Sequence, residues 1–205
     1  MEVLKIFEFL RDEIHTVVMA TAGEDGNPVT CAIDIMDCDA GGLYFLTARG
    51  KNFYSRLKAR PQLSLTGIAG DSTLTRVAVS VSGRAEELGW EGLSRLLDKN
   101  PYMYKIYPTE LSRRALCAFK LCEGSGEVFD LTKTPVERFS FSFGGLGKGS
   151  GYIINEKCSL CGRCLEVCPQ NCISLGSMTA KIAQNNCLRC GNCMAVCPAG
   201  AVKRQ

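Results

Sequence analysis

The residues with the clearest chemistry are cysteines, and nine of the chain's 13 lie between Cys158 and Cys197. They form two runs of one pattern, C-x2-C-x2-C-x3-C-P: CSLCGRCLEVCP at 158–169 and CLRCGNCMAVCP at 187–198. This is the ligand spacing of bacterial [4Fe–4S] sites. Three cysteines separated by two residues each allow one tight loop to reach three corners of a cubane, and the fourth corner must be reached from farther away. The spacing therefore predicts two [4Fe–4S] clusters.

In sites of this kind the fourth cysteine of each run binds the other cluster. We therefore expect one cluster to be held by Cys158, Cys161, Cys164 and Cys197. The other would be held by Cys187, Cys190, Cys193 and Cys168. The ninth thiol, Cys172, is surplus to both sets: it reads as a small buried hydrophobic residue under a cluster, and the alternative is a spare ligand or a ligand to another cluster form.

Two other interpretations of the cysteines are weaker. A disulfide framework needs an oxidising compartment, but the N-terminal residues do not read as a secretory signal, and an odd number of cysteines cannot pair completely. A structural zinc site usually combines two C-x2-C pairs or cysteines with histidines, and His15 is the sole histidine of the chain. The paired runs favour iron–sulfur clusters.

Residues from about 151 onward resemble the two-cluster bacterial ferredoxins. The strand-like segments GYIIN and MTAKIAQ, which precede the two runs, fit the paired hairpins of that fold. A segment of roughly 55 residues is too short to build a self-sufficient apolar core, so the metal–thiolate bonds must supply much of its stability. We expect this segment to be unfolded without iron.

A glycine-rich stretch, FGGLGKGSG at 143–151, precedes the ferredoxin-like segment. It reads as a linker rather than a phosphate-binding loop, because Lys148 is followed by Gly149 and not by Ser or Thr. The predicted domains are therefore residues 1–142 and 152–205, joined by a linker at 143–151.

The elements expected before the linker are mainly short strands. Hydrophobic periodicity predicts helices at 3–14, 51–59 and 89–100, and strands at 15–22, 29–37, 42–48, 62–70, 75–88, 115–124 and 126–132. Many short strands with few helices favour a β-barrel over a doubly wound sheet. The absence of a G-x-G-x-x-G motif argues against a Rossmann nucleotide site.

Four segments carry a resemblance to a known family: DGNP at 25–28, IDIMD at 33–37, GLYFLTARGKNFYSRLKARP at 42–61 and VSVSGRAEEL at 79–88. Together they resemble the pyridoxamine 5′-phosphate oxidase-like family of FMN-binding split barrels, over roughly residues 3–135. The resemblance implies a six-stranded split barrel that dimerises and binds FMN between the subunits. The expected fold class is thus mainly β with α+β elements, a split β-barrel followed by a small ferredoxin-like domain with two [4Fe–4S] clusters.

The resemblance also implies which residues contact FMN. The phosphate contacts would be Thr47 and Lys51, with Ala48 and Asn52 beside them, and the strand along the flavin ring would contribute Ile33 and Asp34. A lysine at the start of a helix suits a dianion, because free backbone N–H groups and the positive end of the helix dipole already favour it. The plain alternatives are a solvated surface lysine and a solvated Asp34.

The sequence departs from the family at a few positions. Relatives often carry an arginine about where Cys31 stands, and Cys31 reads as a buried strand residue rather than a reactive thiol. The residue pattern of true pyridoxamine phosphate oxidases is not visible, so that activity is not carried over and no catalytic residue is assigned. His15 reads as a structural residue.

Charge and hydropathy exclude other classes of protein. The formal charge is +3, but two clusters with four thiolates each add −2 per site, which gives 3 − 4 = −1. Basic residues are scattered, which argues against nucleic-acid binding. No apolar run approaches the roughly 18 residues of a membrane span. We expect a cytoplasmic protein of an anaerobic setting, because exposed iron–sulfur cysteines are oxygen-sensitive.

The leading functional hypothesis is an oxidoreductase that uses FMN and the two clusters. Electrons would pass between an external low-potential carrier or redox protein, the clusters and FMN, which would act on an unknown small molecule. Two alternatives stay open: a non-catalytic electron carrier with the barrel as a flavin-binding dimerisation platform, and a barrel that binds a deazaflavin or haem instead. Whether the protein is an enzyme is not decided by the sequence.

Overall fold

The computed structural model describes residues 2–145 and 151–204, and the chain divides into two compact units. The first unit contains residues 2–69, 78–126 and 141–145, and the second contains residues 70–77, 127–140 and 151–204. Residues 146–150 of the predicted linker lie outside the described residues. The predicted domain boundaries stay a prediction, and each unit is described below by itself.

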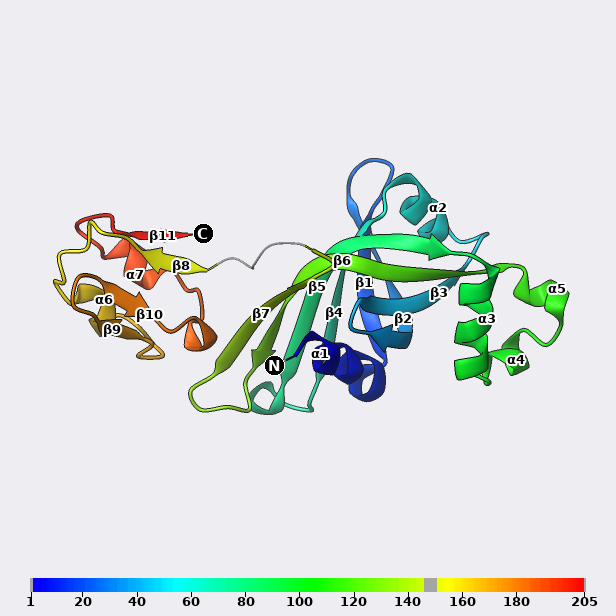
Figure 1. Cartoon of the computed structure of the whole chain (residues 1–205), viewed down its shortest axis with the longest axis horizontal. Helices are drawn as coiled ribbons and strands as arrows, with labels where there is room; N and C mark the ends of the chain where they lie inside the picture. The colour runs from blue at the N-terminus through cyan, green and yellow to red at the C-terminus, as the bar shows by residue number, and fades with distance from the viewer. Residues whose placement is uncertain (1, 146–150, 205) are drawn as a thin grey trace. The chain divides into compact units, whose positions relative to one another are not determined.

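The first unit is built on a barrel of antiparallel strands (Figure 1). The strands are β1 (Thr16–Ala22), β2 (Pro28–Asp39), β3 (Gly42–Ala48), β4 (Gln62–Ala69), β5 (Val77–Leu88), β6 (Leu116–Asp130) and β7 (Glu137–Phe143). Residues 127–130 of β6 and 137–140 of β7, which form a hairpin with the turn between them, are counted in the second unit. The order of the strands is β3-β2-β1-β4-β5-β6-β7, and a further pairing of β3 with β6 closes six of them into a barrel. The predicted six-stranded barrel is confirmed.

Short helices lie between these strands. They are α1 (Val3–Phe9), the π-helix η1 (Leu10–Ile14), α2 (Asn52–Ala59), the 3-10 helix η2 (Thr73–Thr75), α3 (Trp90–Lys99), α4 (Met103–Ile106) and α5 (Glu110–Arg113). The three predicted helices are present, the first with a π-helical last turn.

The expectation of two separate strands at 115–124 and 126–132 is wrong, because β6 runs without a break from Leu116 to Asp130. The segment EGSGE looked like a turn. In the structure its glycines instead allow close strand contact: a Cβ on Gly124 would lie 2.4 Å from the carbonyl oxygen of Ser82, and one on Gly126 would lie 2.6 Å from that of Ser80. Strand β7 was not predicted.

The core of the first unit is apolar and aromatic. Phe7, Phe45 and Leu43 are fully buried, and the rings of Phe45 and Phe119 stack with their centroids 5.7 Å apart. A second cluster forms where the apolar face of α3 packs on β2, β3 and β6. Its buried members are Met36, Tyr44, Leu93, Leu96, Leu97, Met103, Leu116 and Ala118.

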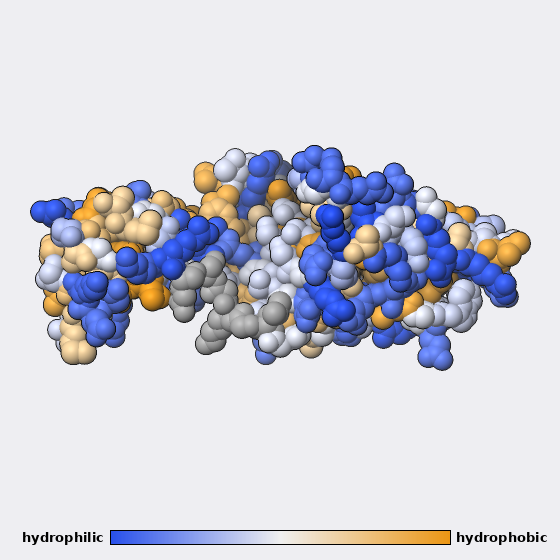
Figure 2. All heavy atoms as spheres, turned by 90° about the horizontal axis from the view of Figure 1, so that it is seen from above, coloured by the Kyte–Doolittle hydropathy of each residue, from blue (hydrophilic) through white to orange (hydrophobic). Residues whose placement is uncertain are grey.

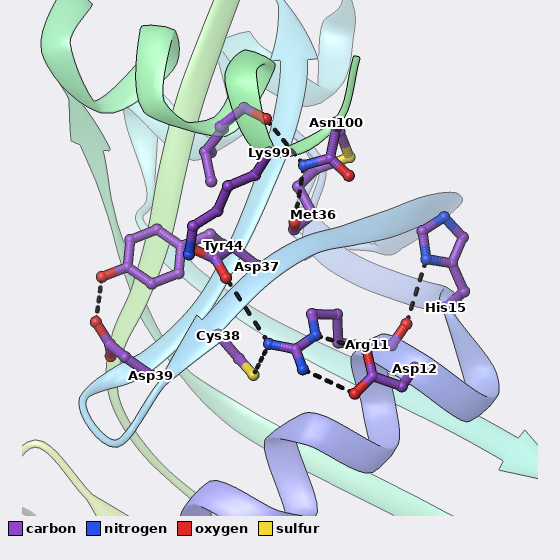
Figure 3. Close-up of polar contacts among 11 residues, drawn as sticks. Arg11, Asp12, His15, Met36, Asp37, Cys38, Asp39, Tyr44, Lys99 and Asn100 are labelled. Carbon is purple, nitrogen blue, oxygen red and sulfur yellow. Dashed lines mark hydrogen bonds and ion pairs between the residues drawn. The ribbon is translucent and has the colours of Figure 1, made fainter. Parts of the chain in front are cut away.

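A bulge in β2 is fixed by polar contacts that Figure 3 shows. The register of β2 with β3 shifts between Ile35 and Asp37, and the side chain of Asn100 donates to the carbonyl of Met36 at the shift and to that of Leu96, both at 2.9 Å. Asp37 is buried, and Lys99 donates to it at 2.7 Å. Because β2 carries Ile33 and Asp34, this network holds the strand that would face the flavin ring.

The C-terminal part of the second unit is a small module of short elements. They are β8 (Tyr152–Ile154), α6 (Arg163–Glu166), β9 (Ile173–Leu175), β10 (Ala180–Ile182), the 3-10 helix η3 (Gln184–Asn186), α7 (Asn192–Ala195) and β11 (Val202–Arg204). Strands β8 and β11 pair, and so do β9 and β10. The segments GYIIN and MTAKIAQ each contribute a strand to one of these pairs, as predicted, but of the two pairs only β9–β10 is a hairpin, because β8 and β11 are the first and last strands of the module. The module leaves Leu175, Met178 and Met194 exposed, and orange patches lie among hydrophilic residues on its visible face, at the left of Figure 2.

Candidate functional site

The first thiol set surrounds one hollow of the C-terminal module. All four predicted ligands, Cys158, Cys161, Cys164 and Cys197, line it. The rest of the wall is mostly apolar and includes Ile154, Leu160, Leu175, Ala180 and Val202. The fold thus brings the last cysteine of the second run beside the first three of the first run.

The second thiol set surrounds a separate hollow. Its lining includes the other four predicted ligands, Cys168, Cys187, Cys190 and Cys193. Each predicted set, three cysteines of one run and the fourth cysteine of the other, therefore lies around one hollow. That these cysteines bind a cluster stays a prediction.

The arrangement suits a cubane better than a single ion. Among the residues of 2–145 and 151–204, no three His, Cys, Asp or Glu side chains converge closely enough to hold one metal ion. A structural zinc ion requires such convergence, with sulfur atoms about 2.3 Å from one centre. Four thiols around a hollow match a cluster that presents one iron at each of four corners.

The last cysteine of each run has a lowered pKa, which favours its thiolate form. The amide of Cys172 donates to the Sγ of Cys168 at 3.4 Å, and that of Ala201 donates to the Sγ of Cys197 at 3.3 Å. Burial raises the pKa of these thiols, but such backbone donors outweigh it and hold the pKa of Cys168 and of Cys197 below the ordinary value. Metal binding requires the thiolate form.

Cys172 lies beside the second thiol set. It is buried, it lines the second hollow, and its Sγ lies 3.5 Å from that of Cys168. Burial, and then the neighbouring Cys168, raise the pKa of the Cys172 thiol well above its ordinary value. A protonated, buried thiol fits the interpretation of Cys172 as a packing residue.

In the barrel, the candidate flavin residues lie where β2 and β3 separate. The pairing of β2 with β3 extends only to Ile35 and Phe45, whereas β2 begins at Pro28. Over residues 28–34 the edge of β2 toward β3 has no strand partner in the described part of the chain. The backbone of Ile33 and Asp34 pairs with β1 on the other side, so its remaining edge is free to bind a planar ring.

The residues after this separation suit a phosphate group. Thr47 is only 3% exposed, and its Oγ1 is buried without a hydrogen-bond partner. A buried hydroxyl without a partner is costly, which favours a missing ligand beside it. Helix α2 starts after Lys51, and no side chain caps its first turn, so its free N–H groups can face an anion. Lys51 and Asn52 are exposed, and Ala48 is half-buried.

Arg56, which the sequence analysis did not single out, lies near these candidate residues. Its Nε donates to the Oγ1 of Thr21 at 2.8 Å, and both Arg56 and Lys51 lie close enough to Cys31 to affect its titration. Burial raises the pKa of the Cys31 thiol, and these two cations offset part of the rise. Arg56 thus places a guanidinium near Cys31.

The side chain of Asp34, a predicted flavin contact, has hydrogen-bond and charge partners within the barrel. Asp34 accepts a hydrogen bond from the hydroxyl of Thr16 at 2.6 Å, and its other carboxylate oxygen lies 3.8 Å from Nε2 of His15. The Nδ1 of His15 lies 3.3 Å from the carbonyl of Arg11, which fits a structural role for the ring. The side chain of Asp34 is therefore engaged within the barrel, and a backbone contact suits it better.

An open groove of the barrel lies next to Thr47 and Ala48, which pair with Cys117 and Leu116 of its wall. It is lined in part by Arg49, Lys58, Glu87, Trp90 and Cys117, and contains none of the six predicted flavin contacts. Burial, and then a hydrogen bond with Glu87, raise the pKa of the Cys117 thiol to about 11, so this cysteine is not a reactive thiolate.

The fold and the thiol sets define a class of protein, a closed β-barrel with an iron–sulfur module of two thiol sets. Residues 5–120 match the sequence profile of the pyridoxamine 5′-phosphate oxidase family, and residues 157–201 match that of the 4Fe-4S dicluster domain. The chain therefore belongs to the pyridoxamine 5′-phosphate oxidase family and carries a ferredoxin domain of the dicluster type. No curated protein matches the chain.

Three solved structures illustrate the barrel fold. A NimC/NimA family protein from Clostridium acetobutylicum aligns with a TM-score of 0.58 at 16% identity, over 69% of this chain and 92% of its own. PhzG from Burkholderia lata, in complex with tetrahydrophenazine-1-carboxylic acid, aligns at 0.54 and 14%, over 67% and 80%. A heme-binding protein from Mycobacterium smegmatis aligns at 0.53 and 14%, over 66% and 57%. Identities this low show the fold alone.

The two family matches support a redox or electron-transfer role. The first belongs to a flavin-binding fold, and the second to a domain that binds iron–sulfur clusters. In the described part of the chain, no helix combines the length and the hydropathy needed to cross a membrane.

Proposed function

We propose that the protein is an oxidoreductase that depends on FMN and on two [4Fe–4S] clusters. Electrons would pass between an external low-potential carrier, the clusters and FMN, and the substrate would be a small molecule. The proposal rests on one observation, which is that two candidate cofactor sites occur in one chain. The barrel has an unpaired edge of β2 and a helix, α2, without a side-chain cap, and the C-terminal module has two sets of four cysteines that each surround a hollow. Bound FMN supplies exchange between one-electron carriers and a two-electron substrate.

In this proposal each part of the barrel site has a defined task. Thr47, Lys51 and the first N–H groups of α2, near Ala48 and Asn52, bind the phosphate. Arg56 supplies the cation that is missing at position 31. The free backbone edge at Ile33 and Asp34 orients the ring.

The flavin site can be tested by removing its cations. Lys51→Met and Arg56→Met should each weaken FMN binding by about 10- to 100-fold, because a charge-assisted hydrogen bond contributes roughly 1.5–3 kcal/mol. Lys58→Met is the matched control on the same helix, since that amine binds Glu87 at 2.8 Å. Quenching of FMN fluorescence gives the affinities. Equal affinities in all three variants would remove these residues from the site.

The coupling of the cofactors needs a separate test. Protein purified without oxygen should contain iron, inorganic sulfide and a flavin that is released on denaturation. A low-potential one-electron donor protein should then reduce the flavin only while the clusters are intact. Flavin turnover that stays the same after the clusters are bleached would show that the two halves act independently.

A non-catalytic carrier and a different barrel ligand are the competing proposals. The relative from Mycobacterium smegmatis is described as heme-binding, so haem deserves a direct check. The buried Thr47 hydroxyl and the cations near Cys31 favour a phosphate-bearing ligand over haem. The absorption spectrum of the ligand released by mild acid separates FMN, deazaflavin and haem.

We also propose that the barrel forms a homodimer, with FMN bound between the subunits, and that the protein works in an oxygen-poor cytoplasm with a redox protein partner. The open edge of β2 supports a site that a second subunit completes. Light scattering of the FMN-loaded protein should give twice the chain mass, with about one flavin per chain. A monomer that retains FMN would contradict the proposed shared site.

A further inference from the structure

The two cluster loops share a backbone conformation but differ in one side chain. The first reads CSLC at 158–161 and the second CLRC at 187–190. The third residue of each, Leu160 or Arg189, has a φ of 56°, in the left-handed region that residues other than glycine rarely adopt. The repeat therefore places an arginine where its counterpart has a leucine.

Arg189 is held by a β-hairpin of the same compact unit. One guanidinium nitrogen, Nη1, donates to Oε2 of Glu127 at 2.5 Å, and the other, Nη2, donates to Oγ of Ser140. Glu127 lies near the end of β6 and Ser140 on β7. The side chain of Arg189 is only 21% exposed, so this is an ordered, largely desolvated contact.

A second arginine completes the arrangement. Nη2 of Arg138 lies 2.6 Å from Oε1 of Glu127, and its Nη1 donates to the carbonyl of Leu188 at 2.6 Å. Both arginines also have a buried Nε without a hydrogen-bond partner. Two guanidinium cations share a single carboxylate, which leaves one net positive charge beside the 187–190 loop.

The positions of the C-terminal module that the hairpin reaches by hydrogen bonds and ion pairs all lie near the second thiol set. Besides Leu188 and Arg189, it reaches Gln170, which accepts a hydrogen bond from the amide of Val136 at 3.1 Å. Asn186 donates to the carbonyl of Val136 at 3.5 Å. Each of these four positions is within two residues of Cys168, Cys187 or Cys190. In the described residues, no hydrogen bond or ion pair joins residues 127–140 to the first loop.

The surroundings of the first thiol set are electrically different. Its loop is flanked by two cations and two anions that cancel in number, namely Lys157, Arg163, Glu156 and Glu166, and all four are exposed. Exposed charges are screened by water and salt, whereas charges with little exposure are screened much less. The two sets therefore experience unequal fields.

We propose that Arg189, Arg138 and Glu127 make the second cluster the one with the higher reduction potential. The inference rests on the proposed ligand sets. Accepting one electron adds one negative charge, which a nearby net positive charge of low exposure stabilises. An electron on the first cluster then moves to the second, so that the first is oxidised and the second reduced by one electron each. No further reactant is needed.

Backbone hydrogen bonds to the cysteine sulfurs can also change a reduction potential, but they do not account for the expected effect of the Arg189 side chain. The last cysteine of each set accepts one from the amide four residues later, at 3.4 Å for Cys168 and 3.3 Å for Cys197, so this contribution is matched between the sets. The amide of Arg189 also donates to the Sγ of Cys187 at 3.4 Å. That bond is a main-chain contact, and a change of the Arg189 side chain leaves it in place.

The test compares substitutions that remove a positive charge with one that removes a negative charge. The holoprotein is titrated electrochemically while the two cluster signals are followed by electron paramagnetic resonance. The signals are assigned with Cys161→Ser and Cys190→Ser. The wild type should show two midpoint potentials, the higher one from the second set. Arg189→Leu should lower that potential alone, and the backbone tolerates leucine there, as Leu160 shows.

Glu127→Gln should shift the same potential upward, because it removes the only anion of the group. A merely structural contact would not give opposite shifts. Arg189→Lys should keep most of the separation, and Arg163→Leu, which removes an exposed arginine next to Cys164, should have a much smaller effect on the first set. If Arg189→Leu loses iron, Arg138→Leu and Glu127→Gln still decide the sign.

Equal potentials in the wild type, a higher potential on the first set, or shifts of the same sign in Arg189→Leu and Glu127→Gln would overturn the inference. A protein without iron or cluster signals would instead overturn the proposed function. The two failures are therefore distinguishable in one preparation.

Discussion

The barrel and the C-terminal module obtain their structure from different sources. Barrel strands reach 15 residues, and the barrel buries large side chains such as Phe7, Phe45 and Leu96 completely. Each strand of the module has three residues, and cysteines make up much of its buried cluster. Large apolar side chains fill the core of the barrel, whereas cysteines fill much of the core of the module.

This difference follows from size. A domain of more than 100 residues can bury enough apolar surface to offset the conformational entropy of folding, whereas a module of about 50 residues cannot. The exposed Met178 and Leu175 show that the module leaves part of its apolar surface in water. We therefore expect much of its stability to come from bonds between cysteine and iron. The predictions below test this contrast, beginning with the largest effect.

Removal of iron should unfold the module and leave the barrel folded. Treatment with a chelator and a reductant under nitrogen should abolish the slow amide exchange of residues 152–204, because no sufficient core remains. The amides of β1, β4 and β5 should stay protected. Native protection between residues 158 and 197 in iron-free protein would mean that the module folds on packing alone.

Loss of a barrel core ring should have the reverse effect. Phe45→Ala should destabilise the barrel by about 3–5 kcal/mol, since it removes a fully buried ring and leaves a cavity. Urea unfolding can be followed by the fluorescence of Trp90, the only tryptophan, which lies in the barrel. The cluster absorbance should not change. Val18→Ala, at a position that is 54% exposed, is the control and should stay within about 0.5 kcal/mol.

The polar contact at the bulge of β2 should have a smaller effect. Asn100→Ala removes the two hydrogen bonds to Met36 and Leu96, and should cost about 1–3 kcal/mol in the same urea experiment. It should also weaken FMN binding, if the bulge positions the strand at the flavin ring. Lys105→Ala on the exposed side of α4 is a matched control. A result equal to the control would mean that packing of α3 alone fixes the bulge.

The smallest expected effect is a dependence of barrel stability on pH. Burial raises the pKa of Asp39, but hydrogen bonds from Tyr44 and Lys120 outweigh it and hold that pKa below the ordinary value. Because the folded pKa lies below the unfolded one, the stabilisation is present above about pH 4 and is lost as the pH falls through the folded value. The side chain is 47% exposed, so screening limits the effect to less than about 1 kcal/mol.

This dependence can be measured with Asp39→Asn. The variant should lose less stability than the wild type between pH 6 and pH 3 in urea unfolding. Identical slopes would show that the hydrogen bonds of Asp39 do not stabilise its charged form. Asp71→Asn, at an exposed position, serves as the comparison.

Much of the fold could be predicted from the sequence because its signals are local. The strand at 42–48 has the predicted bounds, and the helix at 51–59 differs by one residue. The predictions failed where a local signal has two meanings. Gly124 and Gly126 looked like a turn, but they allow β6 to lie close against β5, which depends on a strand about 40 residues earlier in the chain.

The site residues divide in the same way. Lys51 was predicted from the resemblance to a known family and the eight cluster ligands from their short spacings, and these assignments stay predictions. Arg56 was not predicted because it lies on α2, whereas its neighbours Thr21 and Cys31 lie on β1 and β2, far from it in the sequence. Arg189 was not predicted because its ion pair with Glu127, which Arg138 shares, joins segments that are far apart in the sequence.

The amino-acid sequence alone predicted two runs of four cysteines with iron–sulfur spacing and a β-barrel, because the spacing of the cysteines and the alternation of the strands are encoded within a few residues. Only the tertiary structure decided which groups face those sites. The closure of β3 on β6, the free edge of β2 and the unequal charge around the two thiol sets arise between segments far apart in the chain. Contacts of that kind depend on the packing of the whole fold.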